Sequence, residues 1–522
     1  MELAISNPPN NRRLADIDQA LRQREVGRAG VLIERLVQDE PTFVEGWIAA
    51  ARHAQMLGDF NAMRAPLARA LELAPGSPLI RLMDVEAQIH LGDIGAARTA
   101  LKDMEPEAKS DPAWLGRLSE SYAHCGDFVL AERTAKAALA LDRDNAALRY
   151  AYSSALIATG NLVEAEAQLD ALIEANPDDY DAWYNRATLR KQTVESNHIP
   201  ALKAAISKSS GNIRAAVQLN YALAHELEDL GRYDESFAAL KLGADARRSM
   251  MAYRVEKDID TMAEIASVFD QSFFSEPRKG CDTAGPVFVL GLPRSGSTLV
   301  DRILSAHPEV ESLGELNDFP LALGELARTV DGPQNLVRKS AKLNMHQLGE
   351  AYLKRVLPRG SGKRYFIDKA PTNFLYIGLI AAALPNAQII HLNRDPLDNA
   401  LGMYKALFRM GYPFSYDFND LARYMRAKTS LMEHWQSVLP GRVIDVHYEH
   451  IVADQEGETR RLLAALDLEW DPACISFHRN KSPSATASAA QVRRPLYSSS
   501  VGRWRRYEEH LQPLIKALGI AP

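Results

Sequence analysis

An anion-binding loop is the first feature of the sequence with recognisable chemistry. The loop reads Gly291-Leu292-Pro293-Arg294-Ser295-Gly296-Ser297-Thr298. It follows the apolar run Pro286–Leu290, which predicts a buried strand, and it precedes a helical pattern from Leu299 to His307. Where a strand, a loop and a helix follow in this order, main-chain N–H groups at the helix start point at an anion, and the helix dipole adds about 0.3–1 kcal/mol. The sequence therefore predicts a site for a phosphate or a sulfate.

The loop differs from the nucleotide P-loop in the position of its cation. The spacing of Gly291 and Gly296 is that of a P-loop, but Ser297 stands where a P-loop has its lysine, and the cation is Arg294. A kinase or an ATPase would lack the lysine that holds its β- and γ-phosphates. A Gly/Ser turn before a helix is also common, and Ser297 or Thr298 could serve only as an N-cap. A P-loop kinase stays a disfavoured alternative.

Strands and helices alternate after the loop. Further strands are expected at Tyr365–Ile367, Gln388–Leu392 and Val443–Val446, and helices at Asn373–Leu384, Leu397–Arg409 and Asp420–Val438. This alternation predicts a parallel α/β sheet with its ligands at the carboxyl ends of the strands. Lys369, Arg394 and Tyr448 each follow one of these strands and are candidate site residues.

The first half of the chain is periodic. Gly58, Gly92, Gly126 and Gly160 are separated by 34 residues at every step, and the segments between them have helical spacing. Gly160 and Gly231 are 71 residues apart, two periods plus three, so one unit carries a small insertion. A helix–turn–helix unit of this length resembles the tetratricopeptide repeat. We expect a solenoid over residues 10–250 with a groove for a peptide or protein, a linker over 251–283, and an α/β domain over 284–522.

The α/β half resembles the sulfotransferases, and most closely the tyrosylprotein sulfotransferases and bacterial sulfotransferases that carry tetratricopeptide repeats. Pro293 to Leu299 resembles the loop that binds the 5′-phosphosulfate. The other matching segments are Gly314-Glu315, Asp368-Lys369-Ala370-Pro371, Leu392-Asn393-Arg394-Asp395-Pro396, His447-Tyr448-Glu449, Ser488-x-x-Gln491-Val492-Arg493-Arg494-Pro495 and Arg503-Trp504. They cover about residues 284–515, and their shared order makes the resemblance specific.

The resemblance implies transfer of a sulfuryl group from 3′-phosphoadenosine 5′-phosphosulfate (PAPS) to a hydroxyl, without an obligatory metal ion. Glu315 is the expected general base, Lys369 supports the bridging oxygen, and Ser488 adds a hydrogen bond. An ordinary carboxyl, with a pKa of about 4.3, is some six units too acidic to deprotonate tyrosine beforehand, a cost of about 8 kcal/mol. The proton is therefore expected to move as the new S–O bond forms.

The resemblance also assigns the residues that bind the donor. The phosphosulfate would lie on Arg294, Ser295, Gly296, Ser297 and Thr298, and Arg294 would also stabilise the transition state. Arg394 would hold the 3′-phosphate and Tyr448 the adenosine, and the remaining contacts would come from Ser488, Gln491, Arg494 and Arg503. Gly402 departs from the family, which has a serine eight residues after the arginine, so a hydrogen bond to the 3′-phosphate is in question.

Composition narrows the other function classes. The chain has 61 basic and 67 acidic residues and a net charge of −6, which argues against a coat for nucleic acid. Its three cysteines are far apart, so neither a zinc cluster nor a disulfide framework is expected. The longest apolar stretch, Phe374–Leu384, is short of the roughly 20 residues that span a bilayer, and the N-terminal residues are polar.

We therefore expect a cytoplasmic sulfotransferase that acts on tyrosine in a protein or peptide, without nucleic-acid or membrane partners. The alternatives are a small-molecule, lipid or carbohydrate sulfotransferase, and a non-catalytic repeat scaffold with a decayed nucleotide domain. The sequence does not identify the acceptor, the ligand of the repeats or the oligomeric state.

Overall fold

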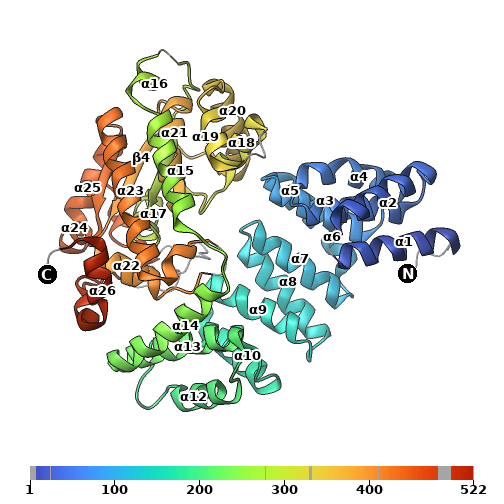
Figure 1. The fold of residues 1–522 in the computed structure, drawn as a ribbon, viewed down its shortest axis with the longest axis horizontal. Coiled ribbons are helices and arrows are strands. Elements are labelled where there is room, and N and C mark those ends of the chain that lie inside the picture. Colours follow the sequence, from blue (N-terminus) through green and yellow to red (C-terminus); the bar gives the residue numbers. More distant parts are fainter. Residues whose placement is uncertain are drawn as a thin grey trace. The chain divides into compact units, whose positions relative to one another are not determined.

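The structure is a computed structural model that describes residues 8–23, 25–276, 278–328, 332–408, 411–479 and 495–520 (Figure 1). Contacts along the chain divide it into two compact units, Met1–Ala155 and Leu156–Pro522. The division falls inside the repeats, so the described residues of the first unit form helices and the turns between them, and the second unit contains the last repeats together with a sheet. The domain boundaries expected from the sequence stay a prediction.

The first unit is built from paired helices. These are α1 (Pro8–Arg22), α2 (Val26–Asp39), α3 (Val44–Met56), α4 (Phe60–Leu73), α5 (Pro78–His90), α6 (Ile94–Ala108), α7 (Pro112–His124), α8 (Phe128–Leu141) and α9 (Ala146–Thr159), which crosses into the second unit. The periodic glycines lie in the turns between paired helices, at φ of +70° for Gly58, +78° for Gly92, +80° for Gly126 and +93° for Gly160. Positive φ costs glycine little, which explains why the period is marked by this residue. The predicted helical repeats are confirmed.

The second unit begins with the remaining repeat helices. These are α10 (Leu162–Ala175), α11 (Tyr180–Ala187), α12 (Ile199–Lys208), α13 (Ile213–Asp229) and α14 (Tyr233–Ser249). The chain between α11 and α12 is irregular, which is where the period of the sequence slips. The expected linker holds two further helices, α15 (Val255–Val268) and α16 (Gln271–Ser275). Helix α15 packs against α23 (Phe418–Val438), where Arg423 forms an ion pair of 2.6 Å with Glu256.

A five-stranded parallel sheet forms the centre of the second unit. Its strands are β1 (Pro286–Gly291), β2 (Val310–Ser312), β3 (Tyr365–Asp368), β4 (Gln388–Asn393) and β5 (Val443–His447), in the order β2-β3-β1-β4-β5. All six residues of β1 are buried, as expected for a central parallel strand. The predicted parallel α/β sheet is confirmed, and β2 is an addition, because a strand of three residues is too short to show an alternating pattern.

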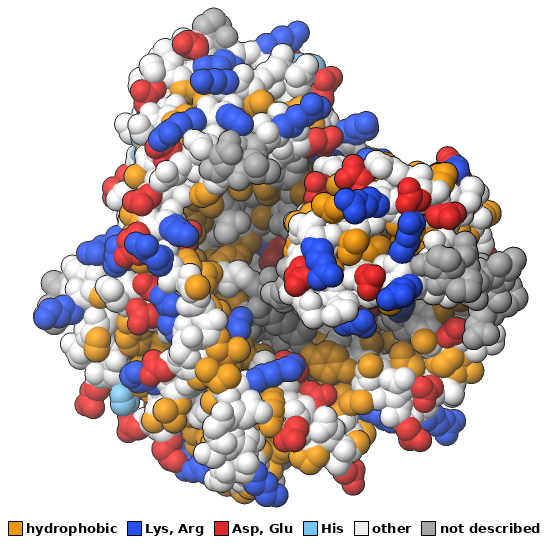
Figure 2. Space-filling model, turned by 45° about the vertical axis from the view of Figure 1, so that its right-hand side comes forward, with side chains coloured by type: hydrophobic (Ala, Val, Ile, Leu, Met, Phe, Trp, Pro, Cys, Tyr) orange, Lys and Arg blue, Asp and Glu red, His pale blue; other side chains and the backbone are white. Residues whose placement is uncertain are grey.

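Helices pack around the sheet and follow its strands. They are α17 (Ser297–Ser305), α18 (Asp318–Ala327), α19 (Pro333–Ser340), α20 (Met345–Val356), α21 (Ile377–Ala383), α22 (Pro396–Tyr404), α23, α24 (Tyr448–Ala453), α25 (Gln455–Ala465) and α26 (Glu508–Leu518). Within the described ranges, no helix combines the length and the apolar character that crossing a membrane requires. Acidic and basic side chains are interspersed on the face drawn in Figure 2, in keeping with their near balance in the sequence.

Two predicted helices are wrong in their extent. The segment expected as one helix from Asn373 is a 3₁₀ turn, Pro371–Tyr376, followed by the short α21. The turn places the Asn373 amide on the buried carboxylate of Asp368, at 3.2 Å. Helix α22 ends at Tyr404, and beyond it the Tyr416 hydroxyl accepts the N–H of Phe408 at 2.8 Å and donates to its C=O at 2.9 Å.

Candidate active site

The predicted anion-binding loop connects β1 to α17. Three of its residues have positive φ, Gly291 at +151°, Arg294 at +66° and Gly296 at +106°. A Cβ atom on Gly296 would lie 2.6 Å from the ring of Tyr448, so only glycine lets the loop approach that ring. Gly296 is also the N-cap of α17, and its carbonyl accepts the N–H of Leu299 at 2.9 Å. The loop therefore presents its backbone amides at the start of a helix, as the sequence predicts.

The side chains of the loop are suited to a buried anion. Ser295, Ser297 and Thr298 are each less than 8% exposed. The Ser295 hydroxyl has no hydrogen-bond partner in the structure, which is costly for a buried polar group and is relieved by a ligand. Because the N-cap is Gly296, neither Ser297 nor Thr298 occupies that position. The alternative in which Ser297 or Thr298 serves only as an N-cap is therefore wrong.

Arg394 reaches the same loop from the end of β4. Its Nη1 donates to the carbonyl of Arg294 at 2.9 Å, and its Nη2 donates to the carbonyl of Ser500 at 2.6 Å. The guanidinium lies over the Tyr448 ring, 4.5 Å from its centroid. The neighbouring carboxylate of Asp395 caps α22 by accepting backbone N–H groups. The structure thus brings Arg294, Arg394 and Tyr448 together.

The loop lies in an electropositive environment. Burial lowers the pKa of Arg294, and the charges of Arg394 and Arg503 lower it further. Arg503 is held near by Asp398 in the first turn of α22, whose carboxylate accepts the N–H groups of Gly502 at 2.6 Å and Trp504 at 2.9 Å. Cations that destabilise one another in this way are stabilised by a bound anion.

Glu315 and Lys369 form an ion pair beside this region. The Lys369 ammonium donates to Glu315 Oε1, and its backbone N–H donates to the carbonyl of Gly314 at 2.9 Å. The lysine side chain is 2% exposed, whereas the glutamate is 49% exposed and accessible to a second substrate. Burial raises the pKa of the nearby Asp301 in α17, while the charge of Lys369 lowers it. Burial and then the Glu315 charge raise the pKa of Tyr412 to about 12, so Tyr412 lies near this carboxylate.

The two carboxylates that neighbour Glu315 in the sequence are engaged elsewhere. Glu311 accepts from the backbone N–H of Ser361 at 2.7 Å and from its hydroxyl at 2.8 Å. Glu309 lies 3.6 Å from Arg364, at the opposite end of β2 from Glu315. Of the three carboxylates, Glu315 is the one that contacts a predicted site residue.

Gly402 lies against the loop rather than apart from it. A Cβ atom at this position would be 3.2 Å from the Cβ of Arg294, closer than most such contacts. The absence of a side chain therefore leaves room for Arg294. Ser488, Gln491 and Arg494, which the sequence also predicts as site residues, lie outside the described residues.

Sequence reasoning missed several residues that shape the site. Ser500 accepts from Arg394, and its hydroxyl bonds to the Tyr448 hydroxyl at 2.6 Å. Asp398 fixes the backbone around Arg503, and Glu228 of α13 pairs with the Arg503 side chain. No sequence pattern marks Ser500 or Glu228. Asp398 could have been noticed as an acidic residue in the first turn of a helix.

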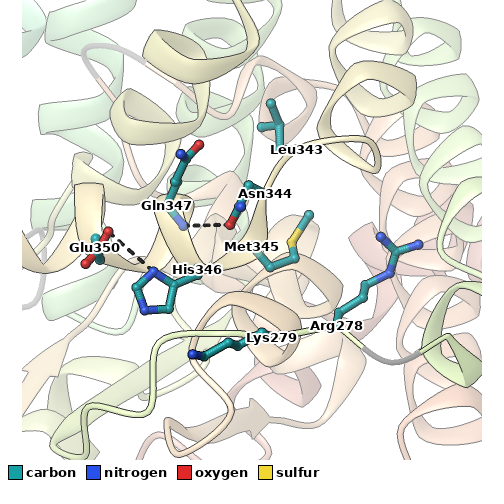
Figure 3. Close-up of a pocket in the computed structure, with 8 residues that line it drawn as sticks. All are labelled: Arg278, Lys279, Leu343, Asn344, Met345, His346, Gln347 and Glu350. Atoms are coloured by element: carbon teal, nitrogen blue, oxygen red, sulfur yellow. Dashed lines mark hydrogen bonds and ion pairs between the residues drawn. The ribbon is translucent and has the colours of Figure 1, made fainter.

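A hollow of about 470 Å³ lies elsewhere in the second unit (Figure 3). Its lining contains none of the predicted site residues and consists of Arg278, Lys279, Leu343, Asn344, Met345, His346, Gln347 and Glu350. In this hollow His346 lies 3.4 Å from Glu350, and Asn344 caps α20 through the N–H of Gln347. The hollow is open and lies apart from the buried loop, so we assign the site from the loop. Over the described part of the chain, no group of three His, Cys, Asp or Glu side chains is placed to hold a metal ion.

Residues 286–472 match the sulfotransferase family, and residues 125–188 match the tetratricopeptide repeat. An uncharacterised protein of Aquifex aeolicus (strain VF5) is 28% identical over 375 residues, which are 70% of this chain and 49% of that protein. The chain thus spans about half the length of that relative.

Two named relatives match smaller parts of the chain. Protein-tyrosine sulfotransferase 1 of Danio rerio is 24% identical over 262 residues, 45% of this chain and 72% of that protein. Omega-hydroxy-beta-dihydromenaquinone-9 sulfotransferase Stf3 of Mycobacterium tuberculosis (strain CDC 1551 / Oshkosh) is 31% identical over 129 residues, 22% of this chain and 33% of that protein. Among solved structures, the sulfotransferase domain from the Synechococcus PCC 7002 olefin synthase is 21% identical, with a TM-score of 0.32, and covers 44% of this chain and 91% of that one. The chain therefore contains a domain of the sulfotransferase family together with tetratricopeptide repeats.

Proposed function

We propose that this protein moves a sulfuryl group from PAPS to a hydroxyl group of an acceptor. One observation carries the proposal: the Arg394 guanidinium binds the main chain of the buried loop that carries Arg294, and its charge lowers the Arg294 pKa, so two cations from different strand ends share one loop. The unpartnered hydroxyl of Ser295 lies in the same loop. A nucleotide with a 5′-phosphosulfate and a separate 3′-phosphate needs such a pair of neighbouring anion sites.

The residues of the loop fit the proposed donor. Backbone amides at the start of α17, with Arg294 and Ser295, would hold the phosphosulfate. Arg394, whose buried Nε has no hydrogen-bond partner, would bind the 3′-phosphate, with Tyr448 beneath it to fix its orientation. PAPS, when bound, supplies the activated sulfuryl group. The chain supplies positioning, charge stabilisation and a proton acceptor.

Glu315 and Lys369 would act on the acceptor side. The acceptor's hydroxyl oxygen bonds to sulfur while the bond from sulfur to the donor's bridging oxygen breaks. The exposed carboxylate of Glu315 takes the hydroxyl proton during this step. Lys369 is buried and already bonded to Glu315, so its ammonium fixes the orientation of that carboxylate. The same ammonium would stabilise negative charge that develops on the leaving oxygen.

The acceptor that we propose is tyrosine in a protein or peptide. The similarity to protein-tyrosine sulfotransferase 1 supports this choice, and so do the repeats, because stacked helical repeats form extended surfaces for polypeptides. A second candidate is a hydroxyl on a small or lipid-like molecule. The similarity to Stf3, whose name specifies a hydroxylated dihydromenaquinone, favours this second candidate.

Calorimetric titration with 3′-phosphoadenosine 5′-phosphate (PAP) tests the donor, with ATP as the comparison. We expect PAP to bind and to raise the thermal midpoint, and ATP to have a much weaker effect. Absence of heat and of any thermal shift with PAP would instead favour a scaffold with a decayed nucleotide domain. Transfer from ³⁵S-labelled PAPS to a tyrosine peptide and to a long-chain alcohol then tests the acceptor. Label in the alcohol alone would make the tyrosine assignment wrong and leave the donor assignment standing.

A further inference from the structure

Repeat helices α13 and α14 pack against the sulfotransferase part within the second unit. The hydroxyl of Tyr221 in α13 donates to the carbonyl of Tyr404, at the end of α22, at 3.0 Å. Ser236 in α14 bonds to the hydroxyl of Tyr507 at 3.2 Å. Both hydrogen bonds are buried, so α13 and α14 are held against the end of α22 and against Tyr507.

One carboxylate of α13 is inserted among the cations of the site. Glu228 is 6% exposed and forms two ion pairs, one with Lys405, just after α22, and one with Arg503 at 2.7 Å. Burial alone would raise the pKa of Glu228, but Lys405 and Arg503 outweigh it and lower that pKa to about 2. The residue is therefore a permanent negative charge at neutral pH.

Arg503 is fixed from two sides. Its backbone is held by Asp398, which accepts the N–H groups of Gly502 and Trp504. Its side chain is held by Glu228. The charge of Arg503 reaches Arg294, whose pKa it helps to lower, and the charge of Arg294 in turn helps to lower the pKa of Lys405, which burial depresses to about 8. Ser500, whose carbonyl accepts from Arg394, lies three residues before Arg503, so the Arg503–Glu228 pair lies close to the anion site.

We propose that Glu228 is a positioning residue for the nucleotide: it holds the Arg503 guanidinium near the loop that carries Arg294, which makes repeat helix α13 part of the donor site. The inference rests on the proposed function. Without the carboxylate, Lys405 and Arg503 would repel each other and the loop arginines, and Arg503 would lose its fixed orientation. The repeats then serve the chemistry directly, in addition to any surface that they offer to an acceptor.

The test is PAP affinity measured by calorimetry on the full-length chain, with Glu228→Gln as the main variant. Gln keeps the shape of the side chain and removes its charge. The matched control is Glu235→Gln in α14, where an exposed carboxylate pairs with Arg232 at 2.6 Å, away from the site. We expect about tenfold weaker binding of PAP by Glu228→Gln and less than a twofold change for the control.

A double-mutant cycle separates positioning from a general loss of structure. If Glu228 acts through Arg503, then Glu228→Gln should change PAP affinity less than twofold in an Arg503→Met background, because the two effects do not add. Unchanged or tighter binding by Glu228→Gln overturns the proposal. An equal tenfold loss in the Arg503→Met background also overturns it, because the effect would then not pass through Arg503.

Misfolding of Glu228→Gln and absence of PAP binding by the wild type are two further outcomes. If Glu228→Gln does not fold because Lys405 is left buried without a partner, the double variant Glu228→Gln/Lys405→Met removes that charge as well. This variant must still bind PAP about tenfold more weakly, and wild-type affinity would refute the proposal. If the wild-type chain does not bind PAP, both the proposed function and this inference are wrong. If the wild-type chain binds PAP and Glu228→Gln has no effect, only this inference is wrong.

Discussion

Replacement of Glu315 by Gln isolates proton transfer from the rest of the site. The amide oxygen of Gln can still accept the hydrogen bond that Lys369 donates to Glu315 Oε1, so the buried lysine keeps an acceptor. Asp301, whose pKa burial raises and the charge of Lys369 lowers, is unchanged in the variant and still gives that lysine a neighbouring carboxyl group. The variant therefore loses a proton acceptor without losing the local structure.

The expected effect is large on turnover and small on binding. Loss of a general base slows a reaction by about 10²- to 10⁴-fold, which corresponds to about 3–5 kcal/mol in the barrier. Glu315 is bonded to Lys369, whereas Arg394 is bonded to the backbone of the loop and of Ser500. PAP affinity should therefore change by less than about threefold.

The assay compares single-turnover transfer of ³⁵S from PAPS with PAP affinity by calorimetry, using whichever acceptor the wild-type chain labels. Glu311→Gln is the matched control, because Glu311 binds the backbone and hydroxyl of Ser361 and should retain turnover. A Glu315→Gln enzyme that turns over within threefold of the wild type would refute the assignment of the base and leave the donor site intact. A loss of PAP affinity as large as the loss of turnover would refute it as well, since the residue would then act on the donor.

Three further variants test the loop and the sheet. Arg394→Ala should weaken PAP binding about 10- to 150-fold, because a charge-assisted hydrogen bond is worth about 1.5–3 kcal/mol, and calorimetry showing less than a threefold change would contradict the clamp. Gly296→Ala should lower the thermal midpoint and PAP affinity together, because its φ of +106° strains alanine and its Cβ would meet Tyr448; unchanged melting would contradict the required close approach. Burial and then Lys428 lower the pKa of His391 to about 4. As the pH falls from about 6.5 to 4, His391 is protonated in the unfolded chain but not in the folded chain, so the free energy of unfolding decreases. The wild-type thermal midpoint should therefore fall more than that of His391→Gln between pH 7 and pH 4.5, and parallel curves would contradict it.

Local patterns predicted the elements of the fold well. The glycine period marks turns that require positive φ, a property of single residues, so the repeats could be predicted without knowledge of their packing. The expected strand Gln388–Leu392 corresponds to β4, Gln388–Asn393, because Ile389, Ile390 and Leu392 are side chains typical of a buried strand. The 3₁₀ turn at Pro371–Tyr376 was not predicted, because a short 3₁₀ segment that runs into a helix has nearly the same apolar spacing as the helix itself.

The positions of site residues that follow a strand could be predicted from the sequence, whereas the partners in the ion pairs of the site could not. Arg294 and Arg394 could be expected at one edge of the sheet, since parallel strands end together. The ion pair of Lys369 with Glu315 joins positions 54 residues apart, and the pair of Arg503 with Glu228 joins a C-terminal segment to a repeat helix. Neither partner choice is encoded in a local pattern, because each depends on how separate segments pack.

The departure at Gly402 shows how geometry changes the meaning of a residue. By resemblance alone, a glycine in place of a serine suggests a lost hydrogen bond and a decayed site. In the structure a side chain at this position would press on the Cβ of Arg294, at 3.2 Å. Arg294 has little freedom to yield, since its φ of +66° is already unusual for a residue with a side chain and its carbonyl is bound by Arg394. A serine here would require Arg294 to shift by a few tenths of an ångström, so Gly402 is better explained as an adaptation to the position of Arg294 than as a sign of decay.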